Sequence, residues 1–200
     1  MSMLPNPLEV RSRDHDILDL FLQRWSPRAL SGEAVNEEDL LRLFEAARWA
    51  PSTYNEQEWR FLYAKKGTPH WDTFFGVLLE ANQVWCKDAA YLIAVVARET
   101  FVRNGNPNPV AILDTGAAMQ NLLLQAAHLN LVAHPMAGFD WEGGPKTFNI
   151  PDGFRLTAMI AVGKPGNPET LPAELAEREQ PTERKPLEKI AREGTFSFEE

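Results

Sequence analysis

The chain has little cysteine, no excess of basic charge and no long hydrophobic run. A single cysteine, Cys86, excludes an internal disulfide, and its neighbours offer no metal-ligand spacing. Twenty lysines and arginines against 28 aspartates and glutamates give a formal net charge of −8. This charge argues against a nucleic-acid-binding protein, which would present a basic face. No apolar stretch approaches the length needed to cross a bilayer, so we expect no membrane segment.

The remaining composition is that of an ordinary globular protein. Hydrophobic residues make up 44% and charged residues 24% of a chain of 200 residues, which is long enough to bury a full core. The N-terminal residues lack the continuous apolar segment of a signal peptide. The four histidines have no ligand spacing with carboxylates. We therefore expect a single domain over residues 1–200, located in the cytoplasm and without a metal site.

Hydrophobic periodicity predicts helices and strands that follow one another along the chain. Helices are expected over residues 14–24, 36–50, 69–85 and 109–131. Strands are expected over residues 59–65, 90–97 and 154–163, with a short strand in the segment 132–139. From Lys164 to Glu200, prolines and charges replace core-forming residues, which predicts an extended C-terminal arm over 164–200 with one short helix near 172–179. Strands separated by helices indicate an α+β or α/β domain.

The expected helix over 109–131 is apolar or small nearly all round. Such a helix needs partners on every side. In a chain of this length it is either the central helix of one core or part of a subunit interface.

The segment RWSPRAL places two arginines and a serine within five positions. No acid lies between Asp19 and Glu33, whereas a solvated surface would mix both signs. Guanidinium groups and a hydroxyl are donors that converge well on phosphate oxygens, which makes Arg24, Ser26 and Arg28 candidates for a phosphate site. The alternative is a helix C-terminus whose arginines only cap carbonyl groups.

Two further segments are typical of contacts to a flat ligand. In APSTYNEQEW, the amides of Asn55 and Gln57 stand at alternate positions, so on an extended segment they would point the same way and fit the edge of a heteroaromatic ring. In HPMAGF, Gly138 would allow the backbone to approach a ring closely. Taken singly, the first segment is better explained as an ordinary polar loop and the second as an ordinary glycine turn.

In this order, these segments resemble the nitroreductase family of FMN-dependent NAD(P)H oxidoreductases. The resemblance extends from Arg24 to about Ile190 and is carried by RWSPR, APSTYNEQEW, DTGAAMQNLLLQA, HPMAGFD, IAVGKP and ERKPLEKI. It implies an α+β nitroreductase-like fold, with a central, mostly antiparallel sheet flanked by helices. It also implies an obligate homodimer with two FMN sites at the subunit interface.

The resemblance assigns cofactor contacts to three groups of residues. The residues matched to the phosphate site are Arg24, Trp25, Ser26 and Arg28, with Arg184 and Lys185 from the late basic segment. The residues matched to those lent by the partner subunit are Pro51, Ser52, Asn55 and Gln57. The residues matched to contacts with the ring are Asn82 and the loop of Pro135, Met136, Ala137 and Gly138. No separate catalytic residue is expected, because the flavin carries the chemistry.

The sequence departs from the family pattern at two places. Glu58 stands where a proline is usual, which predicts a looser turn with a charge near the pocket. Asn130 and Val132 flank Leu131 where glycines are common, so the turn after the long helix is expected to differ.

The activity implied is transfer of hydride from NAD(P)H to FMN, followed by reduction of a small acceptor such as a nitroaromatic or a quinone in a ping-pong cycle. One alternative is a flavin-binding protein without NAD(P)H turnover, serving storage, sensing or regulation. A second is a helical dimer whose arginines bind phosphorylated metabolites without any flavin.

Overall fold

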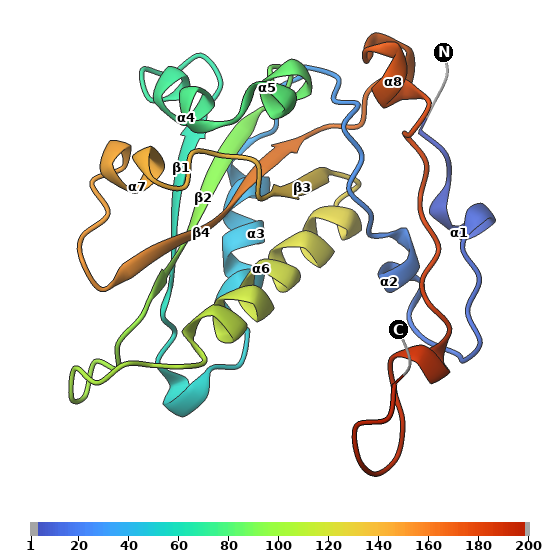
Figure 1. The fold of residues 1–200 in the computed structure, drawn as a ribbon. Coiled ribbons are helices and arrows are strands. Elements are labelled where there is room, and N and C mark those ends of the chain that lie inside the picture. Colours follow the sequence, from blue (N-terminus) through green and yellow to red (C-terminus); the bar gives the residue numbers. More distant parts are fainter. Residues whose placement is uncertain (1–3, 199–200) are drawn as a thin grey trace.

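The computed structural model describes residues 4–198 and contains a four-stranded sheet in the order β1-β2-β4-β3 (Figure 1). Each neighbouring pair is antiparallel. The strands are β1 (Trp59–Lys65), β2 (Tyr91–Arg98), β3 (Val132–Met136) and β4 (Phe154–Gly163). These bounds lie within or close to the expected strands, and the antiparallel sheet with its helices confirms the α+β class.

Both faces of the sheet are covered, which explains why its central strands are apolar almost throughout. Helices α3 (Glu37–Arg48) and α6 (Ala111–His128) pack on one face, where Ile93 and Ile160 are buried. Helices α4 (Trp71–Val77) and α5 (Glu80–Cys86) contribute to the core on the other face, where Leu92 is buried. Successive side chains of a strand point to opposite faces, so a doubly covered strand must be apolar at every position.

Two predicted helices are confirmed. Helix α3 begins after Asn36, whose side-chain oxygen accepts a hydrogen bond from the Asp39 N–H at 2.6 Å, as expected of an N-cap. Helix α6 lies inside the range predicted from its apolar character, although Ile112 and Leu113 near its start are 43% and 72% exposed.

The helix predicted over residues 14–24 is wrong at its first half. Only α2 (Asp19–Gln23) is helical there, and a separate short helix, α1 (Pro7–Val10), precedes it. Ile17 and Leu18 are 46% and 69% exposed, so the first part of the apolar stripe that suggested a helix finds no core on this chain. Without that burial a short helix gains too little free energy to form.

The helix predicted over residues 69–85 is broken into α4 and α5. At the break, Leu78 forms a β-bridge with Phe139, and the Leu79 N–H donates to the Gly138 carbonyl oxygen at 3.0 Å. These contacts with a loop distant in sequence replace the helical hydrogen bonds, so tertiary pairing overrides local helix preference.

The segment after β4 carries three short helical turns. They are η2 (Pro168–Thr170), α8 (Ala173–Ala176) and η3 (Leu187–Lys189), of which α8 falls inside the predicted short helix. Helix α7 (Gly143–Thr147) and the turn η1 (Thr53–Asn55) were not predicted. Figure 1 shows the last part of the chain beside the N-terminal segment, where Arg11 Nε donates to the Thr182 carbonyl oxygen at 3.0 Å. Across residues 4–198, no helix is long and apolar enough to span a membrane.

Candidate functional site

A cavity of about 490 Å³ collects most of the residues predicted to bind phosphate. Its lining includes Trp25, Ser26 and His134. Five arginines surround it, namely Arg11, Arg24, Arg28, Arg178 and Arg184. Sequence reasoning missed Arg11 and Arg178, because each looks like an ordinary surface arginine until the two ends of the chain pack beside residues 24–28. Lys185, by contrast, lines the neighbouring cavity between the N-terminal and C-terminal segments.

A buried carboxylate shapes the wall of this arginine cavity. Glu179 is 1% exposed and accepts hydrogen bonds from the backbone N–H groups of Arg28 and Ala29, the second at 2.7 Å. Its other oxygen lies 3.7 Å from Arg28 Nη1. Glu179 therefore fixes the backbone of the RWSPR segment and orients Arg28, a role that the sequence did not reveal.

The crowding of guanidinium groups favours an anionic ligand. The pKa of Arg24 lies below its usual range because the side chain is buried and because Arg184 is close. Burial, Arg184 and Arg24 lower the pKa of Arg11 in the same way. Arg11 donates to the carbonyl oxygens of Leu22 and Arg24, at 2.6 and 2.9 Å, so it clamps the backbone. A phosphate among these groups would relieve their mutual repulsion.

His134 connects the arginine cavity to the predicted ring-binding loop. Its Nδ1 lies 3.0 Å from the Pro27 carbonyl oxygen, and its ring centroid lies 4.5 Å from that of Trp85. Burial, followed by the charges of Arg28 and Arg24, lowers the pKa of His134 to about 4. The ring is therefore neutral near pH 7, with its proton on Nδ1 donated to Pro27.

The loop after β3 is tied closely to α5. Asn82 Nδ2 donates to the Gly138 carbonyl oxygen at 2.8 Å, and a Cβ on residue 138 would lie 2.5 Å from the same nitrogen. Only glycine therefore fits without displacing Asn82. In the described part of the chain, the N–H groups of Ala137 and Gly138 have no acceptor. The structure thus brings Asn82 together with the predicted loop of Pro135, Met136, Ala137 and Gly138, where these two N–H groups can serve a ligand.

The third predicted group lies elsewhere in the chain. The loop of residues 51–57 is fixed at the start of α6, where the Thr53 N–H donates to Asp114 Oδ2 at 2.8 Å. Trp25 shares a cavity with Ala127 near the other end of α6. The 13 residue steps from Asp114 to Ala127 correspond to about 20 Å of helix. Within one chain, Asn55 and Gln57 are therefore not brought to the arginine cavity.

The conformation of this loop differs from the extended one that the alternating amides suggested. Tyr54, Asn55 and Gln57 have φ angles of 55°, 58° and 47°, in the left-handed region. Gln57 Nε2 donates to Asn55 Oδ1 at 3.1 Å, and the Gln57 N–H donates to Ser52 Oγ at 3.0 Å. The two amides are nevertheless held next to each other, at the surface of a tight turn.

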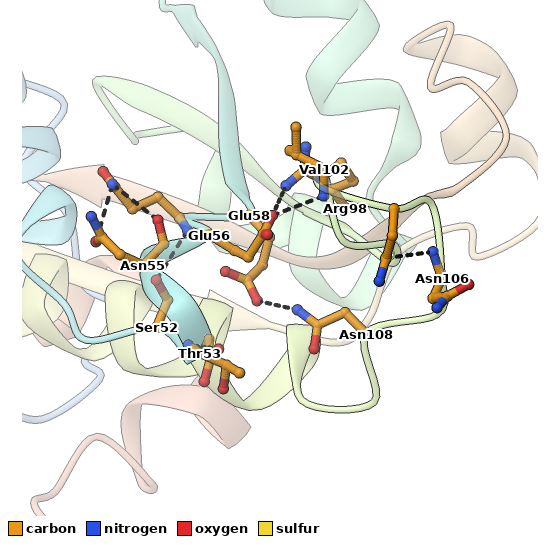
Figure 2. Close-up of polar contacts among 12 residues, drawn as sticks. Ser52, Thr53, Asn55, Glu56, Glu58, Arg98, Val102, Asn106 and Asn108 are labelled. Atoms are coloured by element: carbon orange, nitrogen blue, oxygen red, sulfur yellow. Dashed lines mark hydrogen bonds and ion pairs between the residues drawn. The ribbon is translucent and has the colours of Figure 1, made fainter.

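The expectation of a looser turn at Glu58 is wrong. Glu58 is completely buried beneath the loop, and Asn108 Nδ2 donates to its Oε1 at 2.7 Å (Figure 2). Glu56 secures the loop on another side, since its Oε2 accepts from Arg98 Nη2 at 2.7 Å and from the Val102 N–H at 2.9 Å. Burial raises the pKa of Glu58, and Asp114 raises it further.

Comparison with known proteins agrees with this architecture. The nitroreductase family model matches residues 21–70 and 77–164. A crystal structure described as an oxidoreductase containing FMN is 40% identical, covers 94% of this chain and 97% of its own, and superposes with a TM-score of 0.91. A protein named as a nitroreductase in complex with FMN, from Desulfovibrio desulfuricans, is 26% identical, with coverage of 92% and 100% and a TM-score of 0.68.

A relative from Archaeoglobus fulgidus, named as an NADH dehydrogenase/NAD(P)H nitroreductase, is 24% identical over 159 residues, or 75% of this chain and 86% of its own. The antiparallel sheet, with helices packed on both of its faces, defines an α+β protein. The chain belongs to the nitroreductase family.

Proposed function

We propose that the protein is an FMN-dependent oxidoreductase that takes hydride from NAD(P)H and reduces a small acceptor, such as a nitroaromatic or a quinone, in a ping-pong cycle. The observation that carries the proposal is the joining of the arginine cavity to the Gly138 loop through His134. A phosphate at the first and a ring at the second match the two ends of one FMN. The similarity to FMN-containing oxidoreductases supports this choice of ligand.

The phosphate of FMN would be held by Arg24, Ser26, Arg28 and Arg184. Arg24 Nη1 donates to Ser26 Oγ at 3.3 Å, which holds both groups at the cavity wall. The other N–H groups of Arg24 are then available to phosphate oxygens, and such charge-assisted hydrogen bonds contribute about 1.5–3 kcal/mol each. Trp25 would contribute mainly through its backbone, and Lys185 would act from a neighbouring cavity.

The ring would lie against the loop of Pro135, Met136, Ala137 and Gly138. FMN, when bound, supplies the hydride-accepting ring and the two-electron chemistry. The N–H groups of Ala137 and Gly138 would donate toward the ring and stabilise negative charge that develops on it. Asn82 fixes the direction of these groups by holding the Gly138 carbonyl oxygen. No protein acid or base is required, because solvent can supply the proton.

We propose a homodimer because, within one chain, the second group of predicted flavin contacts lies far from the arginine cavity. About 20 Å along α6 separates the arginine cavity from the loop that carries Pro51, Ser52, Asn55 and Gln57. A second copy of the chain would bring them to the same ring. Exposed apolar side chains on α6, Ile112 and Leu113, provide surface for this contact.

Absorbance spectroscopy followed by anaerobic titration tests the proposal. The purified protein should carry or take up FMN, and NADH or NADPH should bleach the flavin absorbance, which a nitroaromatic or quinone then restores. A bound flavin that neither nucleotide bleaches would favour a flavin-binding protein without turnover. A colourless protein that FMN does not stabilise against heating would favour binding of another phosphorylated molecule.

A further inference from the structure

Two carboxyl groups meet beneath the loop of residues 51–57, and the proposed function uses neither of them. Glu58 is completely buried, and Asp114 on α6 is 9% exposed. Asn108 Nδ2 donates a hydrogen bond to Glu58 Oε1 (Figure 2). The other oxygen of Glu58, Oε2, has no hydrogen-bond partner in the described part of the chain. Asp114 is the neighbouring acid that interacts with the Glu58 side chain, and it accepts a hydrogen bond from the Thr53 N–H.

The surroundings favour a state in which this acid pair holds one proton and that proton lies on Glu58. Two neighbouring carboxylates cannot both ionise cheaply in a buried site. Asp114 is the better place for the negative charge, because it stands in the first turn of α6 and receives a backbone N–H. A proton on Glu58 Oε2 would let this otherwise unpaired oxygen donate a hydrogen bond to Asp114.

Among residues 4–198, no cation forms an ion pair with Glu58. The charged groups around it are Asp114 on α6 and the ion pair between Glu56 and Arg98, whose atoms lie 2.7 Å apart. Arg98 meets Glu58 only through the backbone, where its N–H donates to the Glu58 carbonyl oxygen at 3.0 Å. Its side chain is directed to Glu56. Burial and the repulsion from Asp114 therefore raise the pKa of Glu58.

We propose that Glu58 is held protonated and donates a hydrogen bond to Asp114, so that this acid pair positions the loop of residues 51–57 for its contact with the flavin and releases the loop as the pH rises. Glu58 directly follows Gln57, and Asp114 binds Thr53, so the pair fixes the loop near both of its ends. When the proton leaves for solvent, the two carboxylates repel and both ends loosen. Glu58 is thus a positioning residue, and the inference rests on the proposed function of the loop.

The sign of the pH effect follows from linkage. A carboxyl whose pKa is raised in the folded protein stabilises it fully below the usual value of about 4.5. That stabilisation is lost progressively as the pH rises from there to the folded pKa. Glu58→Gln keeps a donor for Asp114 at every pH, whereas Glu58→Met keeps the size of the side chain without the donor.

The decisive experiment measures the Kd for FMN between pH 5 and pH 9 in the full-length protein and in both variants. The FMN phosphate titrates near pH 6, so the quantity compared is the ratio of the wild-type Kd to the Glu58→Gln Kd at each pH. This ratio should rise about tenfold with pH. Glu58→Met should bind FMN more weakly than Glu58→Gln throughout. Glu38→Gln, which changes an exposed acid on α3, is the control, and the ratio of the wild-type Kd to the Glu38→Gln Kd should not change with pH.

A second measurement separates this inference from the proposed function. Hydrogen exchange of the Thr53 amide, measured without flavin, should be faster in the wild type than in Glu58→Gln at pH 9 and equal in the two at pH 5. If no variant binds FMN at any pH, the proposed function fails, and the Thr53 exchange still decides the role of the acid pair. A constant Kd ratio, or equal Thr53 exchange at both pH values, would overturn the inference.

Discussion

His134 Nδ1 lies 3.0 Å from the carbonyl oxygen of Pro27, so one hydrogen bond joins β3, which precedes the Gly138 loop, to the RWSPR segment. Since burial lowers the pKa of His134 to about 4, this bond belongs to the neutral ring. The relative placement of the two halves of the candidate site therefore depends on a group that titrates in mildly acidic solution.

The first prediction concerns stability in acid. A histidine whose pKa is depressed in the folded protein stabilises it above the usual value of about 6.5, and this contribution is lost as the pH falls toward 4. The free energy of unfolding should drop by about 3 kcal/mol over this range. His134→Asn retains a donor for Pro27 and does not titrate, so urea unfolding of this variant should show a smaller drop. Equal drops in both proteins would contradict the assignment.

The second prediction concerns the contact of Gly138 with Asn82. Gly138→Ala should displace the Asn82 amide, because the new Cβ would lie 2.5 Å from Asn82 Nδ2. A loss of about 1–3 kcal/mol in the free energy of unfolding is expected. In an Asn82→Ala background, the same substitution should cost much less. An equal loss of unfolding free energy in both backgrounds would mean that the strain arises elsewhere in the loop.

The sequence predicted the segments of the site better than their arrangement. The RWSPR segment was recognisable because its charges and hydroxyl are contiguous, and the strands were recognisable because burial on both faces makes them apolar. Arg178 and Glu179 were not recognisable from the sequence, since their role arises only when the C-terminal segment packs against residues 28 and 29. The break between α4 and α5 likewise depends on Gly138, far along the chain.

The third prediction concerns the phosphate. Arg24→Ala and Arg28→Ala should each weaken FMN binding by about 1.5–3 kcal/mol, the size of a lost hydrogen bond to a charged group. Arg42→Ala, which removes a half-exposed arginine of α3 with two acidic neighbours, serves as the control. Flavin retention after dialysis, followed by titration with FMN, measures the effect. If both cavity variants retain flavin like the wild type, the arginine cavity does not hold the phosphate.

The fourth prediction concerns the sharing of each site between two chains. The arginine cavity and the loop with Asn55 and Gln57 lie near opposite ends of α6, so we expect a flavin that contacts both to lie between two subunits. A mixed dimer can then pair one chain carrying Arg24→Ala and Arg28→Ala with one carrying Asn55→Ala and Gln57→Ala. All four substitutions would fall in one site, and the other site would be intact.

The most direct test is the FMN content and NAD(P)H oxidation of that mixed dimer, isolated through a different affinity tag on each chain. Each doubly substituted homodimer should be nearly inactive, because both of its sites are damaged. The mixed dimer should bind one FMN and recover up to about half of the wild-type activity, since well-separated sites behave independently. A mixed dimer that binds no FMN and recovers no activity would contradict the shared site.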